Sequence, residues 1–224
     1  MSIEIEPPPP EYINWHFYPS IRIGVTQHLN RTSRSTLRHV EFYVNGLIVQ
    51  WNRIVDDLKE SRRLMGLDLT RDALAAKVYS QLNDRLELDI HFYLICWDKI
   101  DKHLEKFVDS EGGSECIGVI WKEIKSLTSN ASMGRHYFEH LDKRIVQGKP
   151  EGMGYFFSNY AGFTFRYIDE AKGGKRKEKQ ITLGRSQVEK VILAYEKILR
   201  CLGAGIPAGY AQSVNTEKRA EKTP

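Results

Sequence analysis

The sequence predicts a mainly α-helical fold, a bundle of four to five long helices with one β-hairpin inserted before the last helix. Over most of the chain, apolar residues recur at spacings of three and four, which is the pattern of an amphipathic helix. One segment around residue 165 instead alternates with the period of two that is typical of a β-strand. Glycine and proline interrupt the helical pattern at few positions, so the helices are expected to be long.

The composition is that of one globular domain with extensions at both ends. The chain has 224 residues, and its hydrophobic content of 41% is enough for a core. Residues 33–203 are expected to form the helical domain. Residues 1–32, rich in proline and aromatic residues, are expected to be extended, and the polar residues 204–224 to be disordered. With 33 basic and 29 acidic residues, the net charge of +4 permits an anionic partner without requiring one.

Two long apolar stripes predict the first two helices. The first helix is expected from Ser33 to near Gly66, and the second from a cap at Thr70 to near Val108. Their predicted core positions are Leu37, Val40, Val44, Leu47, Ile48, Trp51, Ile54, Val55 and Leu58 in the first, and Leu74, Val78, Leu82, Leu86, Ile90, Tyr93, Leu94, Trp97, Ile100 and Leu104 in the second. The second helix also carries a polar stripe that we interpret as a solvated face, made of Asp84, Glu87, His91 and Asp98.

Two further helices follow breaks in the pattern. Gly112 and Gly113 interrupt the periodicity, and a third helix is expected from a cap at Ser114. The last helix is expected to begin near Ser186 and to stop at Gly203.

The β-hairpin is expected at about residues 153–183, between these two helices. Residues 163–168 alternate with period two and can pair with residues 180–183 across a long turn that contains Gly173 and Gly174.

The cysteines and the chain's hydropathy predict a cytoplasmic protein. Cys96, Cys116 and Cys201 are odd in number and far apart, which favours reduced thiols over a disulfide framework or a zinc knuckle. The N-terminus has no apolar signal region, and no apolar run is long enough for a transmembrane helix. We therefore expect no membrane association.

The stretch from residue 129 to residue 145 concentrates the groups that move protons and bind phosphate. On a helix, Arg135, His136, Glu139 and His140 would share one polar wall, opposite an apolar face. Cleavage of RNA without a metal needs a group that takes a proton from the ribose 2′-hydroxyl and a cation beside the phosphorane. Histidine suits the first role and arginine the second.

Arg135-His136-Tyr137-Phe138-Glu139-His140 resembles the Arg-x4-His signature of the HEPN superfamily. The resemblance implies a HEPN-like all-helical bundle that carries the motif on a late helix. It also implies a homodimeric endoribonuclease that needs no metal or other cofactor and leaves 2′,3′-cyclic phosphate ends. Such proteins act as toxins, in defence or in RNA processing, some beside an antitoxin that modifies a tyrosine two residues after the histidine. Asp142 occupies that position here.

The resemblance also implies roles for individual residues. His140 would be the general base or acid, Arg135 would stabilise the phosphorane, and His136 would orient or share the proton transfer, with Glu139 beside them. A composite groove across the dimer would be flanked, in second rank, by Glu87 and His91. Positive side chains proposed to bind RNA follow the motif or lie in the turn of the hairpin: Lys143, Arg144, Lys175, Arg176 and Lys177.

Three alternatives remain open from the sequence. In the first, Arg135 pairs with Glu139 one turn away and the chain is a non-catalytic helical scaffold that binds RNA, a nucleotide or a protein partner. In the second, His136 and His140 bind zinc, although the cysteines offer no obvious third ligand. In the third, the motif is a chance match, since Arg34 and His39 have the same spacing. The later match is preferred because it has an apolar flank, a second histidine and a late position.

Overall fold

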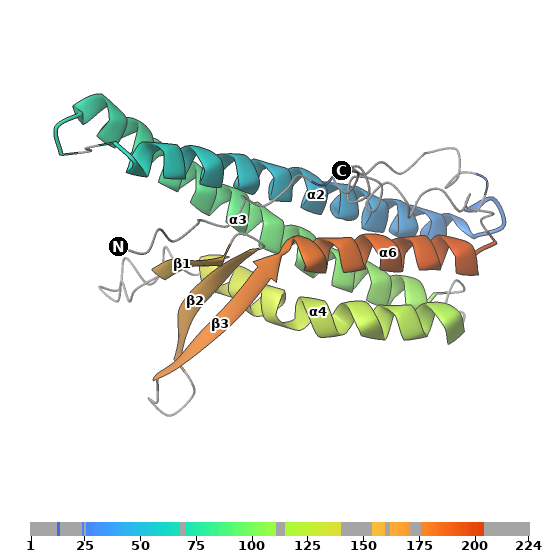
Figure 1. The fold of residues 1–224 in the computed structure, drawn as a ribbon. Helices are drawn as coiled ribbons and strands as arrows, with labels where there is room; N and C mark the ends of the chain where they lie inside the picture. The colour runs from blue at the N-terminus through green and yellow to red at the C-terminus, as the bar shows by residue number, and fades with distance from the viewer. Residues whose placement is uncertain are drawn as a thin grey trace, which may run out of the picture.

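The computed structural model describes residues 13, 24, 26–67, 70–110, 115–139, 154–159, 162–170 and 176–203 (Figure 1). Only the backbone is described for the strands and for most residues between 129 and 139. The elements in chain order are α2 (Arg31–Met65), α3 (Ala73–Val108), α4 (Glu115–Glu139), β1 (Gly154–Asn159), β2 (Gly162–Glu170), β3 (Arg176–Gly184) and α6 (Arg185–Cys201). The prediction of a mainly helical bundle is confirmed. Within these ranges no helix combines the length and apolar character needed to cross a bilayer.

Helices α2 and α3 form a long antiparallel pair (Figure 1). The Ser33 and Ser110 hydroxyls, 2.9 Å apart, join the start of α2 to the end of α3. Side-chain caps fix both helix starts, because the Asn30 side chain accepts a hydrogen bond from the Ser33 amide and Asp72 accepts one from the Ala75 amide. The N-cap of α3 is therefore Asp72, and the prediction of Thr70 as the cap was wrong. The negative charge of the Asp72 carboxylate is also favourable at the positive end of the helix dipole.

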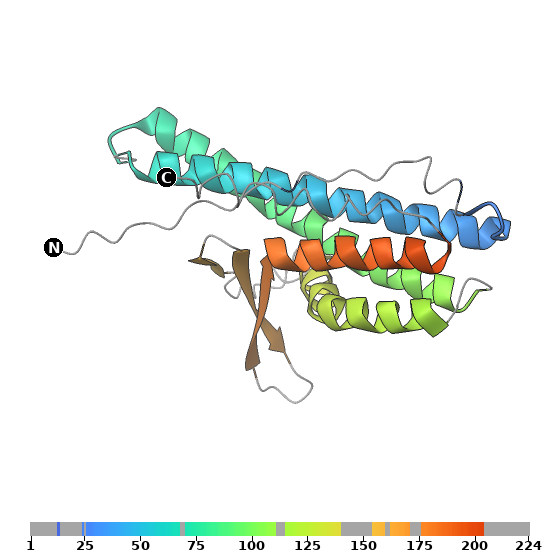
Figure 2. The same ribbon diagram turned by 45° about the vertical axis from the view of Figure 1, so that its right-hand side comes forward.

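The core lies where α2, α3, α4 and α6 meet, with α6 running alongside α2 and α4 (Figure 2). Its largest fully buried side chains are Trp51, Tyr93, Trp97, Phe107 and Tyr195. Every predicted core position of the first helix is buried.

Two predicted core positions of the second helix were wrong. Leu74 is 72% exposed and Val78 is also exposed. Both lie in the first turns of α3, where the pair with α2 ends beyond the main core. A small separate cluster there buries Leu64, Ala75 and Leu82 instead.

Helices α2 and α3 approach closely at Gly46. A Cβ atom at this position would lie 2.9 Å from the Cys96 sulfur. Any side chain larger than that of glycine would therefore push the two helices apart at this point. Cys96 is buried, and burial raises the pKa of its thiol to about 12, so the thiol stays protonated at neutral pH.

The segment between α4 and α6 forms a three-stranded antiparallel sheet in the order β1-β2-β3 (Figure 2). In the register between β2 and β3, Phe163 is opposite Leu183 and Phe165 is opposite Ile181. This differs from the single hairpin that the sequence predicted, because β1 adds a third strand. The Gly154–Asn159 segment is rich in aromatic residues but does not alternate, so period alone could not identify it. Strand β3 continues directly into α6.

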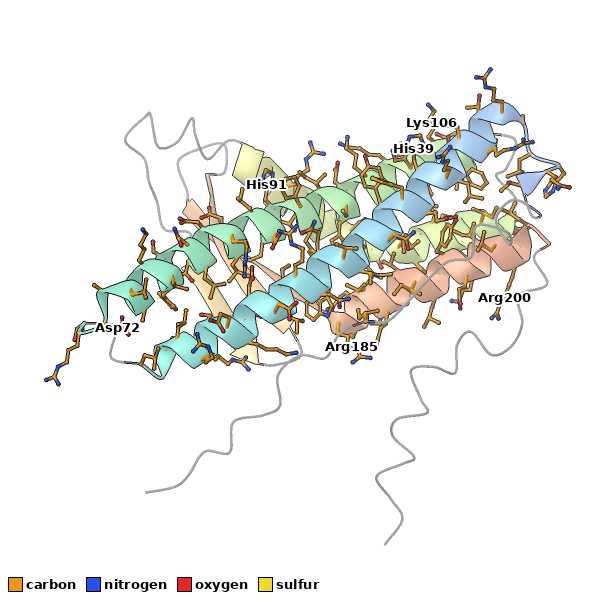
Figure 3. The ribbon with its side chains drawn as sticks, turned by 90° about the horizontal axis from the view of Figure 1, so that it is seen from above. His39, Asp72, His91, Lys106, Arg185 and Arg200 are labelled. Carbon is orange, nitrogen blue, oxygen red and sulfur yellow. A yellow bond between two sulfur atoms is a disulfide. The ribbon has the colours of Figure 1, made fainter. Side chains whose placement is uncertain are left out.

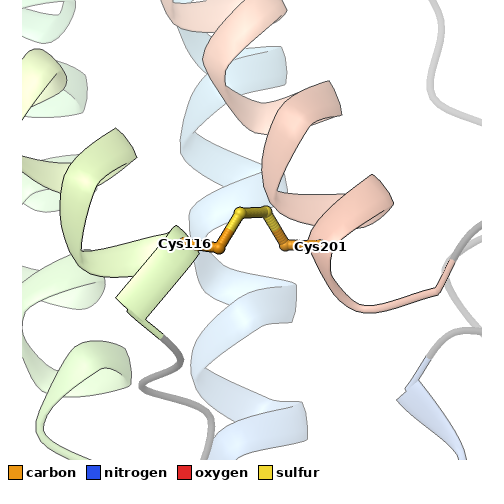
Figure 4. The surroundings of a disulfide bond; sticks show 2 residues. All are labelled: Cys116 and Cys201. Atoms are coloured by element: carbon orange, nitrogen blue, oxygen red, sulfur yellow. A yellow bond between two sulfur atoms is a disulfide. The ribbon is translucent and has the colours of Figure 1, made fainter.

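A disulfide joins Cys116, in the first turn of α4, to Cys201, at the end of α6 (Figure 4). The prediction of three reduced thiols was therefore wrong for two of them. The residues are 85 positions apart in sequence, but the packing of α4 against α6 brings their Cα atoms to 6.4 Å, within the range of a disulfide. Of the three cysteines, only Cys96 is free.

Candidate functional site

The structure places only part of the predicted catalytic stretch. Arg135, His136 and Glu139 belong to α4, which ends at Glu139, and the side chains of His136 and Glu139 are not described. The remaining predicted residues that lie outside the described part are His140, Lys143, Arg144 and Lys175. Arg176 and Lys177 begin strand β3, opposite Glu170 and Asp169 of β2.

Arg135 is held at the interface between α4 and α3. Its guanidinium Nη1 donates a hydrogen bond to Oδ2 of Asp98, a carboxylate that is only 2% exposed. The Arg135 side chain itself is 19% exposed. The alternative ion pair between Arg135 and Glu139, one helical turn away, involves the Glu139 side chain, which the structure does not describe. The partner that the structure places beside Arg135 comes from another helix.

Asp98 also binds Lys102, one turn later in α3, with the ammonium 3.0 Å from the same Oδ2 atom. A buried carboxylate is stable only when cations and hydrogen-bond donors compensate the loss of water. Two cations around one carboxylate leave the group with a net positive charge. A guanidinium carries five N–H donors, so an arginine oriented by one carboxylate can still face a second anion.

Asp98 is a functional candidate that the sequence analysis misassigned. The polar stripe on the second helix was interpreted as a solvated face, yet Asp98 is buried, Glu87 and His91 are partly buried, and Asp84 is exposed. The spacing of four residues between Asp98 and Lys102 is the signal that could have identified an ion pair.

Glu87 and His91 lie on the same side of α3 as Asp98 (Figure 3 shows His91). His91 precedes Asp98 by seven residues, which is two helical turns or about 10 Å, and Glu87 lies one turn further. Arg135 therefore meets α3 at one end of this polar strip. Arg135 of α4 therefore contacts the same side of α3 that carries Glu87 and His91.

Helix α4 is fixed to its neighbours by polar contacts along its length. The Trp121 indole N–H donates to Asp101 of α3 at 3.1 Å, and the Lys125 ammonium lies 3.6 Å from Glu105. On the other side, Lys197 of α6 donates to Glu123 at 3.2 Å. The partly buried Trp121 contact helps to fix the rotation of α4 that brings Arg135 to α3, whereas the two exposed ion pairs contribute little to it.

Two further ion pairs cross between α2 and α3, and the sequence analysis did not predict them. Arg53 of α2 binds the buried Asp89 of α3 at 3.0 Å, and Arg85 of α3 binds the buried Asp57 of α2. Burial raises the pKa of Asp89, against the opposing effect of Arg53. Both helices carry the spacing Arg-x3-Asp, which is the signal for this reciprocal arrangement. These pairs fix the register of α2 against α3.

No group of three or more His, Cys, Asp or Glu side chains within the described ranges is arranged to hold a metal ion. The zinc interpretation involves His136 and His140, whose side chains lie outside those ranges.

Comparison of the chain with protein-family models, with curated proteins and with solved structures finds no match.

Proposed function

We propose that this chain is a metal-independent endoribonuclease of the HEPN type, acting as a homodimer in a toxin, defence or RNA-processing role. The cytoplasmic location expected from reduced thiols loses that support, because Cys116 and Cys201 form a disulfide. The proposal is supported by the Arg-x4-His motif of the sequence, whose arginine lies near the end of α4 in a mainly helical bundle. An antitoxin or another protein partner would regulate it.

The observation that carries the proposal is the contact of Arg135 with Asp98. Catalysis by electrostatic stabilisation requires donors that are already oriented where negative charge develops. The buried Asp98 orients the guanidinium from α3, while Lys102 keeps the local charge positive.

The reaction divides between the residues as follows. One imidazole, that of His140, takes the proton from the ribose 2′-hydroxyl, and the 2′-oxygen attacks the adjacent phosphorus. Arg135 stabilises the phosphorane. The bond to the 5′-oxygen breaks, and an imidazole, His136 or the second His140 of the dimer, returns a proton to that oxygen. The products are a 2′,3′-cyclic phosphate and a 5′-hydroxyl.

Two variants test these roles against a matched control. We expect His140→Ala to reduce the rate of RNA cleavage by about 10²-fold or more, the usual contribution of a general acid or base. Arg135→Lys keeps the charge but loses the bidentate donor geometry, so it should also be slow. Lys125→Gln, an exposed position on the same helix, should cleave at the wild-type rate. Equal rates in all three variants would contradict the assignment.

A second candidate function is a non-catalytic helical scaffold that binds RNA, a nucleotide or a protein partner. One observation favours it: the Arg135 side chain is mostly buried and already engaged by Asp98, as a purely structural ion pair would be. Under this alternative, folded wild-type protein would bind RNA without cleaving it.

A further inference from the structure

A second polar site lies between the first half of α2 and the last turns of α3, around α3 from the contact of Asp98 with Arg135. His103 of α3 stacks against two rings from α2. Its ring centroid is 5.1 Å from that of His39 and 5.6 Å from that of Tyr43, and the ring planes differ by 19° and 17°. His39 and Tyr43 are one helical turn apart, so the three rings form a column across the two helices. Figure 3 shows His39 and Lys106 close together at this end of the pair.

The column is accessible and its hydrogen-bonding groups are partly oriented. His39 is exposed, whereas Tyr43 and His103 are half-buried. The Nδ1–H of His39 donates to the Ser35 carbonyl at 2.7 Å, so the Nε2 atom is available to a ligand. Phe42 is 67% exposed and contacts the Tyr43 ring edge-on, with centroids 5.2 Å apart. A large exposed aromatic ring beside a polar column is suited to stacking.

The charge around the column is positive. Lys99 and Lys106 lie about one turn before and after His103 on the same face of α3. Asp98, Asp101 and Glu105 lie about 110° around the helix from the two lysines and contact α4, whereas the exposed Asp109 caps the end of α3 one turn after Lys106. In the part of the chain that the structure describes, no acidic side chain forms an ion pair with Lys99 or Lys106.

The electrostatics of His103 agree with this arrangement. Burial lowers the pKa of His103, and the positive charges of His39, Lys99 and Lys106 lower it further. A bound anion would oppose these effects and favour the imidazolium. Binding of an anion should therefore strengthen as the pH falls toward the reduced pKa of His103.

We propose that His39, Tyr43 and His103, together with Phe42, Lys99 and Lys106, form a binding site for single-stranded RNA. The lysines and imidazole edges contact the phosphates and the exposed ring of Phe42 stacks on a base. Proteins that bind single strands combine a positive surface with aromatic platforms in this way. The inference rests on the proposed function, because it assigns this site a role in holding the RNA that Arg135 and His140 cleave.

The geometry argues against two other uses of the same residues. A metal ion would be repelled by the two lysines. In-line transfer at phosphorus places the acid and the base on opposite sides of the reacting atom, whereas stacked imidazoles lie side by side. Binding is thus the chemistry that the arrangement fits.

The test measures RNA binding without cleavage. Fluorescence anisotropy with a labelled 2′-O-methyl oligoribonucleotide, which lacks the attacking hydroxyl, would compare full-length wild type with Lys99→Gln/Lys106→Gln and with Phe42→Ser. We expect the double variant to bind at least tenfold more weakly. Its slope of log affinity against log salt should be shallower by about 1.4, about 0.7 per lost phosphate contact. Phe42→Ser should weaken binding about five- to tenfold, the lower part of the range for one stacked base.

Controls separate this inference from the proposed function. Lys125→Gln, which removes one exposed lysine on α4, should bind as wild type. His140→Ala should bind the oligoribonucleotide with the affinity of wild type. A variant that loses cleavage but keeps this affinity would support the binding site. Unchanged affinity in the double lysine variant would overturn the inference. Equal binding of duplex RNA, or full displacement by millimolar inorganic phosphate, would also overturn it, because both outcomes leave no role for a stacked base.

Discussion

The contact between Asp98 and Arg135 predicts a large and measurable coupling between α3 and α4. Asp98 is almost fully buried, whereas Arg135 is 19% exposed and Lys102 is 55% exposed. Removing one partner of a buried ion pair costs about 3–5 kcal/mol. Because both cations retain some contact with water, we expect Asp98→Asn to cost about 3 kcal/mol, the lower end of that range. For a chain of this length, that loss lowers the Tm by about 6–12 °C.

A double-mutant cycle isolates the pairwise energy. Urea unfolding of wild type, Asp98→Asn, Arg135→Gln and the double variant should give a coupling energy of about 2 kcal/mol. The matched control is the Lys125–Glu105 pair, which joins the same two helices but has both side chains about half exposed. Such surface pairs contribute about 0–1 kcal/mol. A coupling energy at Asp98 and Arg135 no larger than in the control cycle would refute the assignment of Asp98 as the residue that holds Arg135.

Three further predictions concern the bundle itself. Reduction of the Cys116–Cys201 disulfide should destabilise the fold by about 4.5 kcal/mol, the value for a loop of this length, and a Cys201→Ser variant should show no response to reductant in thermal unfolding. Gly46→Ala should lower the unfolding free energy by about 1 kcal/mol, because the clash with Cys96 outweighs the better helix propensity, and should become stabilising in a Cys96→Ala background. Because the pKa of Asp89 is raised above 3.8, the stability of wild type relative to Asp89→Asn should be greatest below about pH 3.8 and fall as the pH rises through that raised pKa. Urea titrations from pH 3 to pH 7 would check this, and a relative stability that rises with pH would contradict it.

The helices were predictable because their burial repeats along the sequence. All the apolar positions predicted for α2 are buried, since one continuous face of a long helix packs against the core. The same reasoning failed at Leu74, because periodicity does not indicate where the neighbouring helix ends. It also missed strand β1, whose aromatic run has no alternation.

Contacts between distant parts of the chain were not predictable from one sequence. Asp98 has the spacing of a solvated polar stripe, and only the packing of α4 shows that it is buried beside Arg135. Cys116 and Cys201 gave no sign of pairing for the same reason. His39 was considered only as part of a chance match to the Arg-x4-His spacing. Its proposed role depends on stacking against His103, which is distant in the sequence but has its ring centroid 5.1 Å from that of His39.

The most direct test of the account is cleavage of a structured, end-labelled RNA by purified wild-type protein in EDTA, with the ends of the products identified. The account predicts cleavage that persists in the chelator and leaves 2′,3′-cyclic phosphate and 5′-hydroxyl ends. Absence of cleavage by folded, dimeric protein would contradict it and favour the helical scaffold. Cleavage that disappears in EDTA and returns with zinc would contradict it in favour of a metal site.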